Sequence, residues 1–491
     1  MTDVTPLPIA ETKSPPVGEV GREHRLPQGA LGLFDISAAT MANVAPAMSF
    51  YFGFGFLAFT AGVASPLTIL AAGVAIAFLA NTLSEFAKVI PSTGGFITFV
   101  GKTFGPTSAV TTALLAGLGY ITAMASVIAI SGGFLSIILN YYFKWNVPWG
   151  IFTVVLVAAS VAMMIKGVSI STKVAGTFFS FELAVLVIVS IAALIKAPHL
   201  NFTPFEPSHI TKGFSGLAAG FPLAIYLFIG WENSAALAEE TDNPRHNVPR
   251  AVFLSAGIML VAYLLFAYST VSGFGYNVNT LSSAAIPFIT VAHSTIGLFV
   301  LFAYLAGMTS TLGALIAGTN SQARLVFNSG REGLLPGWVG RVHKTRRTPV
   351  HAIVSFVGIA LLIIGGWAVF DLAQGKHLQL SAVNFFAESS TMGTILVLLV
   401  YLAANLALPF FIRKHGTVAF NPLKHGVLPV LGAASIVVPL YYLSKPGQTS
   451  PYDWYPYVAL VILVLSILYA IVLTRRDPSL GERVGSIIAD E

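Results

Sequence analysis

The sequence predicts an all-α membrane protein with about twelve transmembrane helices. Hydrophobic residues make up 55% of the 491 positions and charged residues only 9%, whereas a soluble domain carries roughly a quarter charged residues. Many apolar stretches also reach the ~20 residues that an α-helix needs to cross a bilayer. A large soluble core is excluded, because its helices would keep a polar outer face that these segments lack.

The apolar stretches are separated by short polar segments and define twelve expected spans. These cover residues 31–60, 64–89, 106–138, 148–165, 174–195, 215–238, 250–272, 285–318, 349–370, 382–411, 426–443 and 455–474. The polar, proline-rich stretch before them has no apolar segment typical of a signal peptide, so we expect a disordered tail there.

We divide the chain by these spans into five parts. They are a cytoplasmic tail (1–28), a first half with spans one to five (29–205), a second half with spans six to ten (206–415), a trailing pair of spans (416–474) and a second cytoplasmic tail (475–491).

The basic residues predict the orientation. An even number of spans places both termini on one side, and 21 of the 26 Lys and Arg residues lie in the tails and loops of that side. Cytoplasmic loops carry an excess of Lys and Arg. We therefore expect a multi-pass protein of the cell membrane with both termini in the cytoplasm. This distribution explains the net charge of +6, so no nucleic-acid partner is expected; the bilayer is the expected surrounding.

A short internal repeat links the two halves. The run Phe96-Ile97-Thr98 is followed by Gly105, and the run Phe288-Ile289-Thr290 is followed by Gly297 at the same spacing. Each run leads into an unusually long span, the third and the eighth. Because these spans are an odd number of crossings apart, the two halves would lie in the membrane with opposite orientations, as in carriers with a five-plus-five inverted repeat.

In such carriers the first helix of each half is interrupted near the middle of the membrane. Span one contains Pro46, which cannot donate its helical hydrogen bond, and span six contains Gly230, a weak point in a helix. An ordinary proline kink and a packing glycine are the alternatives. Residues around both positions are the expected substrate site: Asn43, Val44, Ala45, Pro46, Ala47, Met48, Ser49, Tyr226, Phe228, Ile229, Gly230, Trp231 and Asn233.

Three carboxylates are expected deep within the spans, namely Glu182, Glu232 and Glu388. No Lys or Arg is expected at comparable depth. A bare carboxylate in hydrocarbon costs several kcal/mol, so each must take a proton, a cation or a substrate ammonium group, or else serve as a structural, permanently protonated side chain. Thr309 and Ser310 in span eight are candidates to line an ion site, although hydroxyls in mid-helix commonly bond back to their own helix.

Three longer stretches carry a resemblance to a known family. They are FIGWENSAALAEETDNPRHNVP from Phe228 to Pro249, EFAKVIPSTGGFITFVGKTFG from Glu85 to Gly105, and RLVFNSGREGLLP from Arg324, followed by Arg347-Thr348-Pro349. Together they resemble the amino acid–polyamine–organocation (APC) transporter superfamily over about residues 30–475. The resemblance implies the LeuT-type fold, with discontinuous helices one and six and a substrate held between helices one, three, six, eight and ten.

The resemblance also suggests roles for single residues. Glu232 matches an acid linked to pH sensing in the family's exchangers, and Tyr226 matches a gating Trp. Glu182 falls where some proton-coupled relatives carry a Lys. Pro46-Ala47-Met48 stand where Gly-Ser-Gly is usual. This departure removes one backbone donor, which weakens recognition of a carboxylate and favours an amine.

These features predict a secondary active transporter that moves a small amino acid or related amine by alternating access. Protons are the expected coupling ion and Glu182 the expected carrier. The alternatives are an exchanger in which Glu232 and Glu388 hold ammonium groups, a sodium-coupled symporter, and a channel-like protein. No enzyme is expected, because the sequence has no G-x-S-x-G, H-E-x-x-H or P-loop motif; no catalytic residue, metal site or cofactor is expected either.

Overall fold

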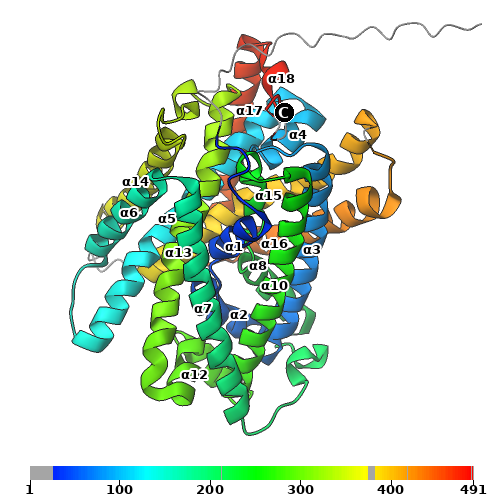
Figure 1. Ribbon diagram of the computed structural model, residues 1–491. Helices are drawn as coiled ribbons and strands as arrows, with labels where there is room; N and C mark the ends of the chain where they lie inside the picture. Colours follow the sequence, from blue (N-terminus) through cyan, green and yellow to red (C-terminus); the bar gives the residue numbers. More distant parts are fainter. Residues whose placement is uncertain (1–25, 212, 374–381, 417, 488, 490–491) are drawn as a thin grey trace, which may run out of the picture.

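A computed structural model describes residues 26–211, 213–373, 382–416, 418–487 and 489. These residues form a bundle of α-helices (Figure 1). The helices are α1 (Leu33–Val44), α2 (Pro46–Ala61), α3 (Ser65–Val89), α4 (Phe96–Phe104), α5 (Pro106–Phe143), α6 (Trp149–Ile165), α7 (Val168–Lys196), α8 (Gly213–Tyr226), α9 (Asn233–Ala236), α10 (Pro244–Gly273), α11 (Val278–Ser283), α12 (Pro287–Ile296), α13 (Val300–Arg331), α14 (Val350–Ala373), α15 (Ala382–His415), α16 (Leu428–Ser444), α17 (Tyr455–Arg476) and α18 (Leu480–Arg483).

The predicted all-α membrane fold is confirmed. Within the described residues, nine helical stretches are long and apolar enough to cross a membrane, and one of them, Leu33–Val89, contains both of the first two expected spans. Two shorter apolar helices, Trp149–Ile165 and Gly213–Tyr226, coincide with the fourth and sixth expected spans. Together these helices account for the twelve spans. Residues 374–381, which include part of the expected loop before span ten, lie outside the described residues.

The inverted repeat is visible in two short helices. α4 precedes the long helix α5, and α12 precedes the long helix α13. Figure 1 places α4 and α12 at opposite ends of the bundle. Gly105 and Gly297, the glycines of the sequence repeat, end these two short helices with φ angles of 97° and 55°, a left-handed backbone that glycine adopts without strain. The repeated glycine therefore marks the same turn in both halves.

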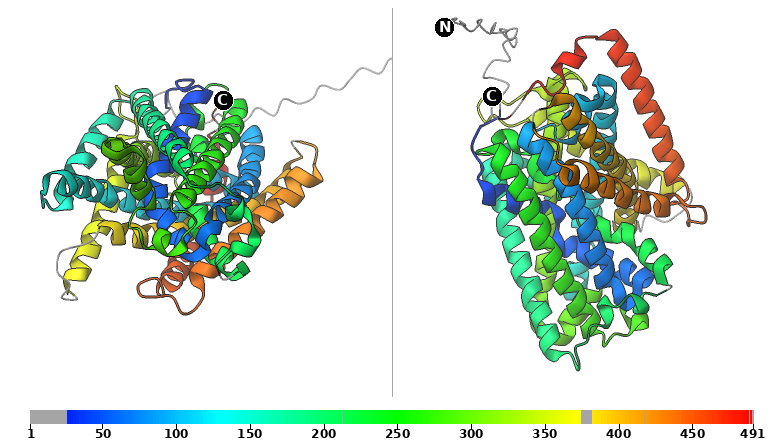
Figure 2. Two further views of the ribbon diagram at one scale, coloured as in Figure 1. Left: turned by 90° about the horizontal axis from the view of Figure 1, so that it is seen from below. Right: turned by 90° about the vertical axis from the view of Figure 1, so that its right-hand side faces the viewer.

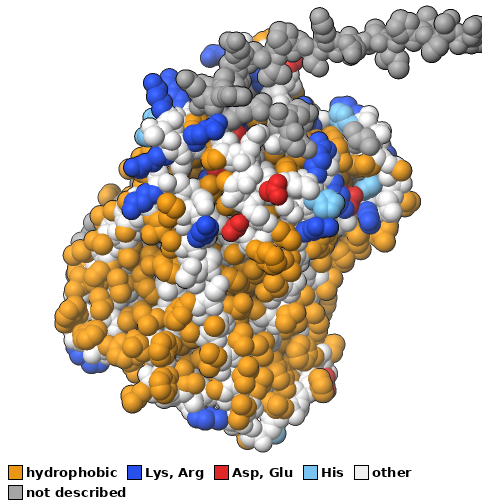
Figure 3. All heavy atoms as spheres, in the orientation of Figure 1, with side chains coloured by type: hydrophobic (Ala, Val, Ile, Leu, Met, Phe, Trp, Pro, Cys, Tyr) orange, Lys and Arg blue, Asp and Glu red, His pale blue; other side chains and the backbone are white. Residues whose placement is uncertain are grey.

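The charged side chains gather at one end of the bundle (Figure 3). The segment before α1 lies at this end, and the chain returns to it in α18 and beyond, where the Ala489 amide donates to the Pro91 carbonyl at 2.9 Å. Below this end, the visible face of the bundle is largely covered by hydrophobic side chains. We call the charged end the terminal face and the other end the opposite face. Figure 2 shows the helices running between the two faces.

Candidate functional site

The first helix is interrupted at Ala45, which separates α1 from α2. Ala45 has a left-handed backbone with φ 53° and ψ 68°, a conformation that costs a non-glycine residue free energy and is found where function requires it. Pro46 begins α2 at a position where a missing N–H does no harm. The Val44 carbonyl, which the break leaves without a helical partner, accepts a hydrogen bond from the Ser49 hydroxyl at 2.8 Å.

The amides that begin α2 are all engaged by protein groups. The Ala47 amide donates to Oε2 of Glu182 at 3.2 Å, the Met48 amide donates to Oγ of Ser310 at 3.0 Å, and the Ser49 amide donates to the Ala45 carbonyl at 2.8 Å. We expected these amides to be offered to a substrate. Instead, a carboxylate of the protein's own occupies the N-terminus of a half-helix, where negative charge is stabilised.

Glu182 projects from α7 into this break and is completely buried. Its Oε1 atom accepts no hydrogen bond from the described residues, and the Ser310 hydroxyl lies beside the same carboxylate. Glu182 forms no ion pair within the described part of the chain. The neighbouring Thr309, the other candidate of span eight, instead donates to the Ala306 carbonyl of its own helix at 3.1 Å.

The second break lies between α8 and α9. Residues 227–232 form turns instead of α-helix, and the Leu227 carbonyl accepts a hydrogen bond from the Tyr263 hydroxyl at 2.7 Å. Gly230 has a φ of 104°, and a Cβ atom there would lie 2.6 Å from Nδ2 of Asn43. The two breaks therefore meet at these residues, and only glycine fits the contact.

The Glu232 carboxylate accepts hydrogen bonds from the second break and from α5. Its Oε2 atom accepts the Gly230 amide at 3.2 Å, and its Oε1 atom accepts the hydroxyl of Tyr120 from α5 at 2.7 Å. Each interrupted helix is thus bonded through backbone amide to one buried glutamate. Sequence reasoning missed Tyr120, because a Tyr in an apolar helix carries no signal of its partner.

Two of the three aromatic candidates pack in the interior, and the third, Tyr226, lies toward the opposite face. Phe228 packs edge-on against Tyr263, and Trp231 packs between Phe96 and Tyr401. Both rings thus pack in the interior, and their expected contact with substrate stays a prediction. Their rings lie against neighbouring helices because the turns of residues 227–232 rotate them away from the helical face assumed from sequence.

Tyr226 lies at the base of a large cavity of about 470 Å³. The cavity is on the side of the opposite face, lined by α2, α8, α15, α16 and the segment that follows α16. Phe386 contacts Tyr226 edge-on and also contacts Phe52, and all three rings line the cavity. We call this cavity the vestibule. Its volume is in the range of small-molecule sites.

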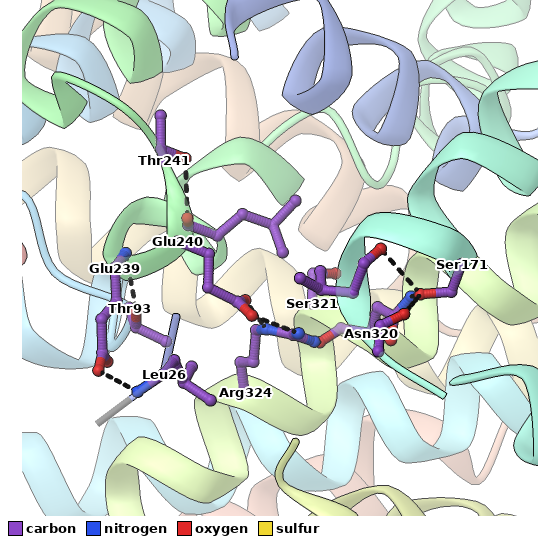
Figure 4. A network of polar contacts seen from close by, with 12 residues as sticks. Leu26, Thr93, Ser171, Glu239, Glu240, Thr241, Asn320, Ser321 and Arg324 are labelled. Atoms are coloured by element: carbon purple, nitrogen blue, oxygen red, sulfur yellow. Dashed lines mark hydrogen bonds and ion pairs between the residues drawn. The ribbon is translucent and has the colours of Figure 1, made fainter. Parts of the chain in front are cut away.

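Buried ion pairs lie near the terminal face, and Figure 4 shows the one between Arg324 and Glu240. The guanidinium of Arg324 in α13 bonds both carboxylate oxygens of Glu240, and both side chains are 1% exposed. One residue earlier, Glu239 pairs with Arg331 at 2.6 Å and accepts the amide of Leu26, before α1, at 2.8 Å. These contacts join the segment before α1 and the segment after α9, and both are tied to α13 through Arg324 and Arg331.

Arg324 lies beyond residue 318, the predicted end of span eight, and therefore outside the spans for which no Lys or Arg is expected. Arg324 is fully buried because α13 continues to Arg331, well past the predicted end of span eight at residue 318. Arg324 begins one of the three stretches that carry the family resemblance. Its partner Glu240 is remote in the chain, so no local sequence pattern predicts this ion pair.

The position of Glu388 corrects the expectation that this carboxylate is deeply buried. The side chain is half-buried, and its Oε2 atom accepts the indole N–H of Trp367 from α14 at 2.8 Å. The Glu388 charge also acts on Tyr452 and Tyr455. The helical register of α15 directs Glu388 toward these outer elements and away from the two breaks.

The two interrupted helices contact each other at Gly230 and Asn43. This arrangement is typical of an inverted-repeat carrier. The sequence model of the family described as amino acid permease matches residues 31–476. The chain belongs to this family, within the APC superfamily. It is a multi-pass membrane protein of a transporter family.

The chain is similar in sequence to two bacterial relatives and in fold to one solved structure. The chain is 25% identical to the amino acid permease YecA of Bacillus subtilis, covering 69% of this chain and 78% of the relative. It is 26% identical to the branched-chain amino acid permease BcaP of Bacillus subtilis, covering 70% and 75%. A manganese transporter from Eremococcus coleocola shares the fold with a TM-score of 0.55 at 12% identity, covering 93% of this chain and 99% of the other.

Proposed function

We propose that this amino acid permease is a secondary active transporter that moves a small amino acid or related amine by alternating access, coupled to protons at Glu182. The hydrogen bond from the Ala47 amide to Glu182 carries the proposal. It is supported by the family match and by relatives whose names describe amino acid transport.

Proton coupling would follow because Glu182 and a substrate carboxylate compete for the same backbone amides of α2. A substrate carboxylate would bind best at the N-terminus of α2, where the helix dipole and free amides favour negative charge. The Glu182 carboxylate occupies that position. When Glu182 takes a proton, it loses its charge and its hold on the Ala47 amide weakens, since hydrogen bonds to charged groups are the stronger ones. The half-helix is then free for the substrate.

Alternating access would use the two faces in turn. In the described structure, the terminal face is closed by the Arg324–Glu240 pair, and the opposite face is hollowed by the vestibule. Substrate would enter past Tyr226, bind at the two breaks and leave after the ion pairs separate. By the distribution of Lys and Arg, the terminal face would be cytoplasmic.

Uptake by proteoliposomes tests the proposal. The purified protein is reconstituted and given radiolabelled amino acids and biogenic amines, one at a time, with an inward proton gradient, an inward sodium gradient or neither. We expect at least one amino acid to accumulate with the proton gradient alone. Accumulation only with sodium would contradict proton coupling, and the absence of any uptake would contradict the transporter itself.

An exchanger is the second candidate, favoured by one observation. Glu232 lies at the second break with no ion pair among the described residues, so it could hold a substrate ammonium group. Release of preloaded label only when substrate is present outside would favour exchange over symport.

A further inference from the structure

A second, much smaller cavity adjoins Glu232. It measures about 20 Å³ and lies between α1, α5, α9, α13, α15 and the segment 94–97. Asn233 and Gln322 line it and are 3% and 8% exposed. Three of their atoms, Oδ1 and Nδ2 of Asn233 and Oε1 of Gln322, have no hydrogen-bond partner among the described residues.

Unpartnered polar atoms at this depth indicate a bound polar molecule. Each one left unsatisfied costs about 1–3 kcal/mol, and native proteins commonly satisfy such groups with a buried water. A water needs a cavity of roughly 10–15 Å³ or more and two to four polar partners. The cavity meets both conditions, and its size admits one water but excludes an amino acid.

The position of the cavity suggests what this water does. Glu232 lines the cavity, and so do Gly94 and Gly95, in the segment between α3 and α4 at the terminal face. Asn43 and Leu325, which also line the cavity, are partly exposed. The lining contains no Lys or Arg. A water here is therefore adjacent to Glu232 and close to solvent at the terminal face.

We propose that this cavity is a proton-loading site, in which one water held by Asn233 and Gln322 carries protons between the terminal face and Glu232. The water gives one proton to the Glu232 carboxylate and accepts one from the next water toward solvent, so the carboxylate becomes neutral and the water is unchanged. The two amides hold the water without titrating.

The other groups near Glu232 fit this role. The titratable side chains that act on it are Tyr120 from α5 and Tyr401 from α15. A tyrosine loses its proton only near pH 10 when unperturbed, so both hydroxyls stay neutral while Glu232 exchanges its proton. The inference adds a proton route to the proposed transporter, and it rests on that proposal only for the use made of the proton.

The test follows the Glu232 carboxyl signal by time-resolved infrared spectroscopy after a pH jump, in the purified full chain without substrate. Glu232→Gln identifies the signal. Gln322→Met and Asn233→Leu replace the two amides by apolar side chains of similar size. Ser321→Ala is the control, because Ser321 lines the same cavity while its hydroxyl already bonds the Gly318 carbonyl at 3.1 Å.

We expect the protonation rate of Glu232 to fall about tenfold or more in Gln322→Met or Asn233→Leu, which corresponds to a barrier higher by roughly 1.4 kcal/mol, and to be unchanged in Ser321→Ala. Wild-type rates in both amide variants would overturn the proposal, as would a high-resolution map showing the cavity dry. No substrate is used here, so a negative result would overturn the proton-loading site without contradicting transport. A failed uptake experiment would likewise not contradict the proton-loading site.

Discussion

The backbone amide of Ala47 donates to the carboxylate of Glu182 across 3.2 Å, which joins the first residue after a proline in α2 to the middle of α7. This contact stands where a carrier of this architecture would be expected to bind the charged end of its substrate. A carboxylate of the protein itself therefore lies at the N-terminus of α2.

Substrate binding should lose its pH dependence in Glu182→Gln. The glutamine carbonyl can still accept the Ala47 amide, but it carries no charge and imitates the protonated form. We expect the variant to bind an amino acid with the same affinity across neutral pH, whereas wild-type binding strengthens as pH falls. Isothermal titration at several pH values measures this. Glu388→Gln is the matched control, because Glu388 faces Trp367; if it loses pH dependence as well, the assignment to Glu182 is wrong.

Gly230→Ala should disrupt the crossing of the two breaks. The added Cβ would lie 2.6 Å from Nδ2 of Asn43, and the backbone has a φ of 104°, so we expect a loss of about 1–3 kcal/mol from strain alone. Thermal unfolding should occur at lower temperature and uptake should be abolished. Gly257→Ala is the control, since a Cβ there meets no atom within 4 Å. Equal stability of the two variants would contradict the account of the crossing.

Opening of the terminal face should follow from Glu240→Gln. Breaking one partner of a buried ion pair leaves the Arg324 charge uncompensated and costs about 3–5 kcal/mol. The sequence contains no cysteine, so a single Ala236→Cys reports on access without further changes. We expect faster labelling of this cysteine by a polar maleimide in the Glu240→Gln background. The exposed pair of Glu206 and His209 supplies the control, Glu206→Gln, which should leave labelling unchanged; equal labelling in both backgrounds would refute this role of the ion pair.

The C-terminal segment should dock more firmly at low pH. Glu332, just after α13, accepts the Gly485 amide at 3.0 Å. Burial raises the pKa of Glu332 from 4.5 to about 7 and outweighs the opposing effects of the Asn328 side chain, the Gly485 amide, Arg331 and Lys102. A raised pKa in the docked state means that docking is strongest below pH 4.5 and weakens as pH rises through about 7, because the undocked carboxyl ionises first.

Labelling of a single Ala489→Cys measures this docking. We expect the labelling rate to rise with pH in the wild-type background and to be nearly constant in Glu332→Gln. Glu482→Gln changes an exposed carboxylate of α18 and should keep the wild-type pH dependence. A pH dependence that survives in Glu332→Gln would place the titrating group elsewhere.

The architecture was predictable because its causes are local or periodic. Apolar length marks the spans, and the glycines at 105 and 297 repeat because the same left-handed turn is needed twice. Pro46 marked the first break, although the hinge itself is Ala45, since proline is favourable at the start of α2.

The site was less predictable because its contacts join distant parts of the chain. The sequence indicated that Glu182 and Gly230 matter, but not that they touch Ala47 and Asn43. Arg324 and Glu240 lie in different helices, so their pairing depends on the tertiary fold.

The central claim is that a proton on Glu182 accompanies the substrate, and proton movement can be measured directly. Proteoliposomes containing the protein and a trapped pH-sensitive dye are given, at zero initial proton gradient, an outward potassium diffusion potential and the amino acid identified by the uptake experiment. The account predicts acidification of the lumen with wild-type protein and none with Glu182→Gln, although the variant still equilibrates labelled substrate. Equal acidification by the two proteins would contradict it.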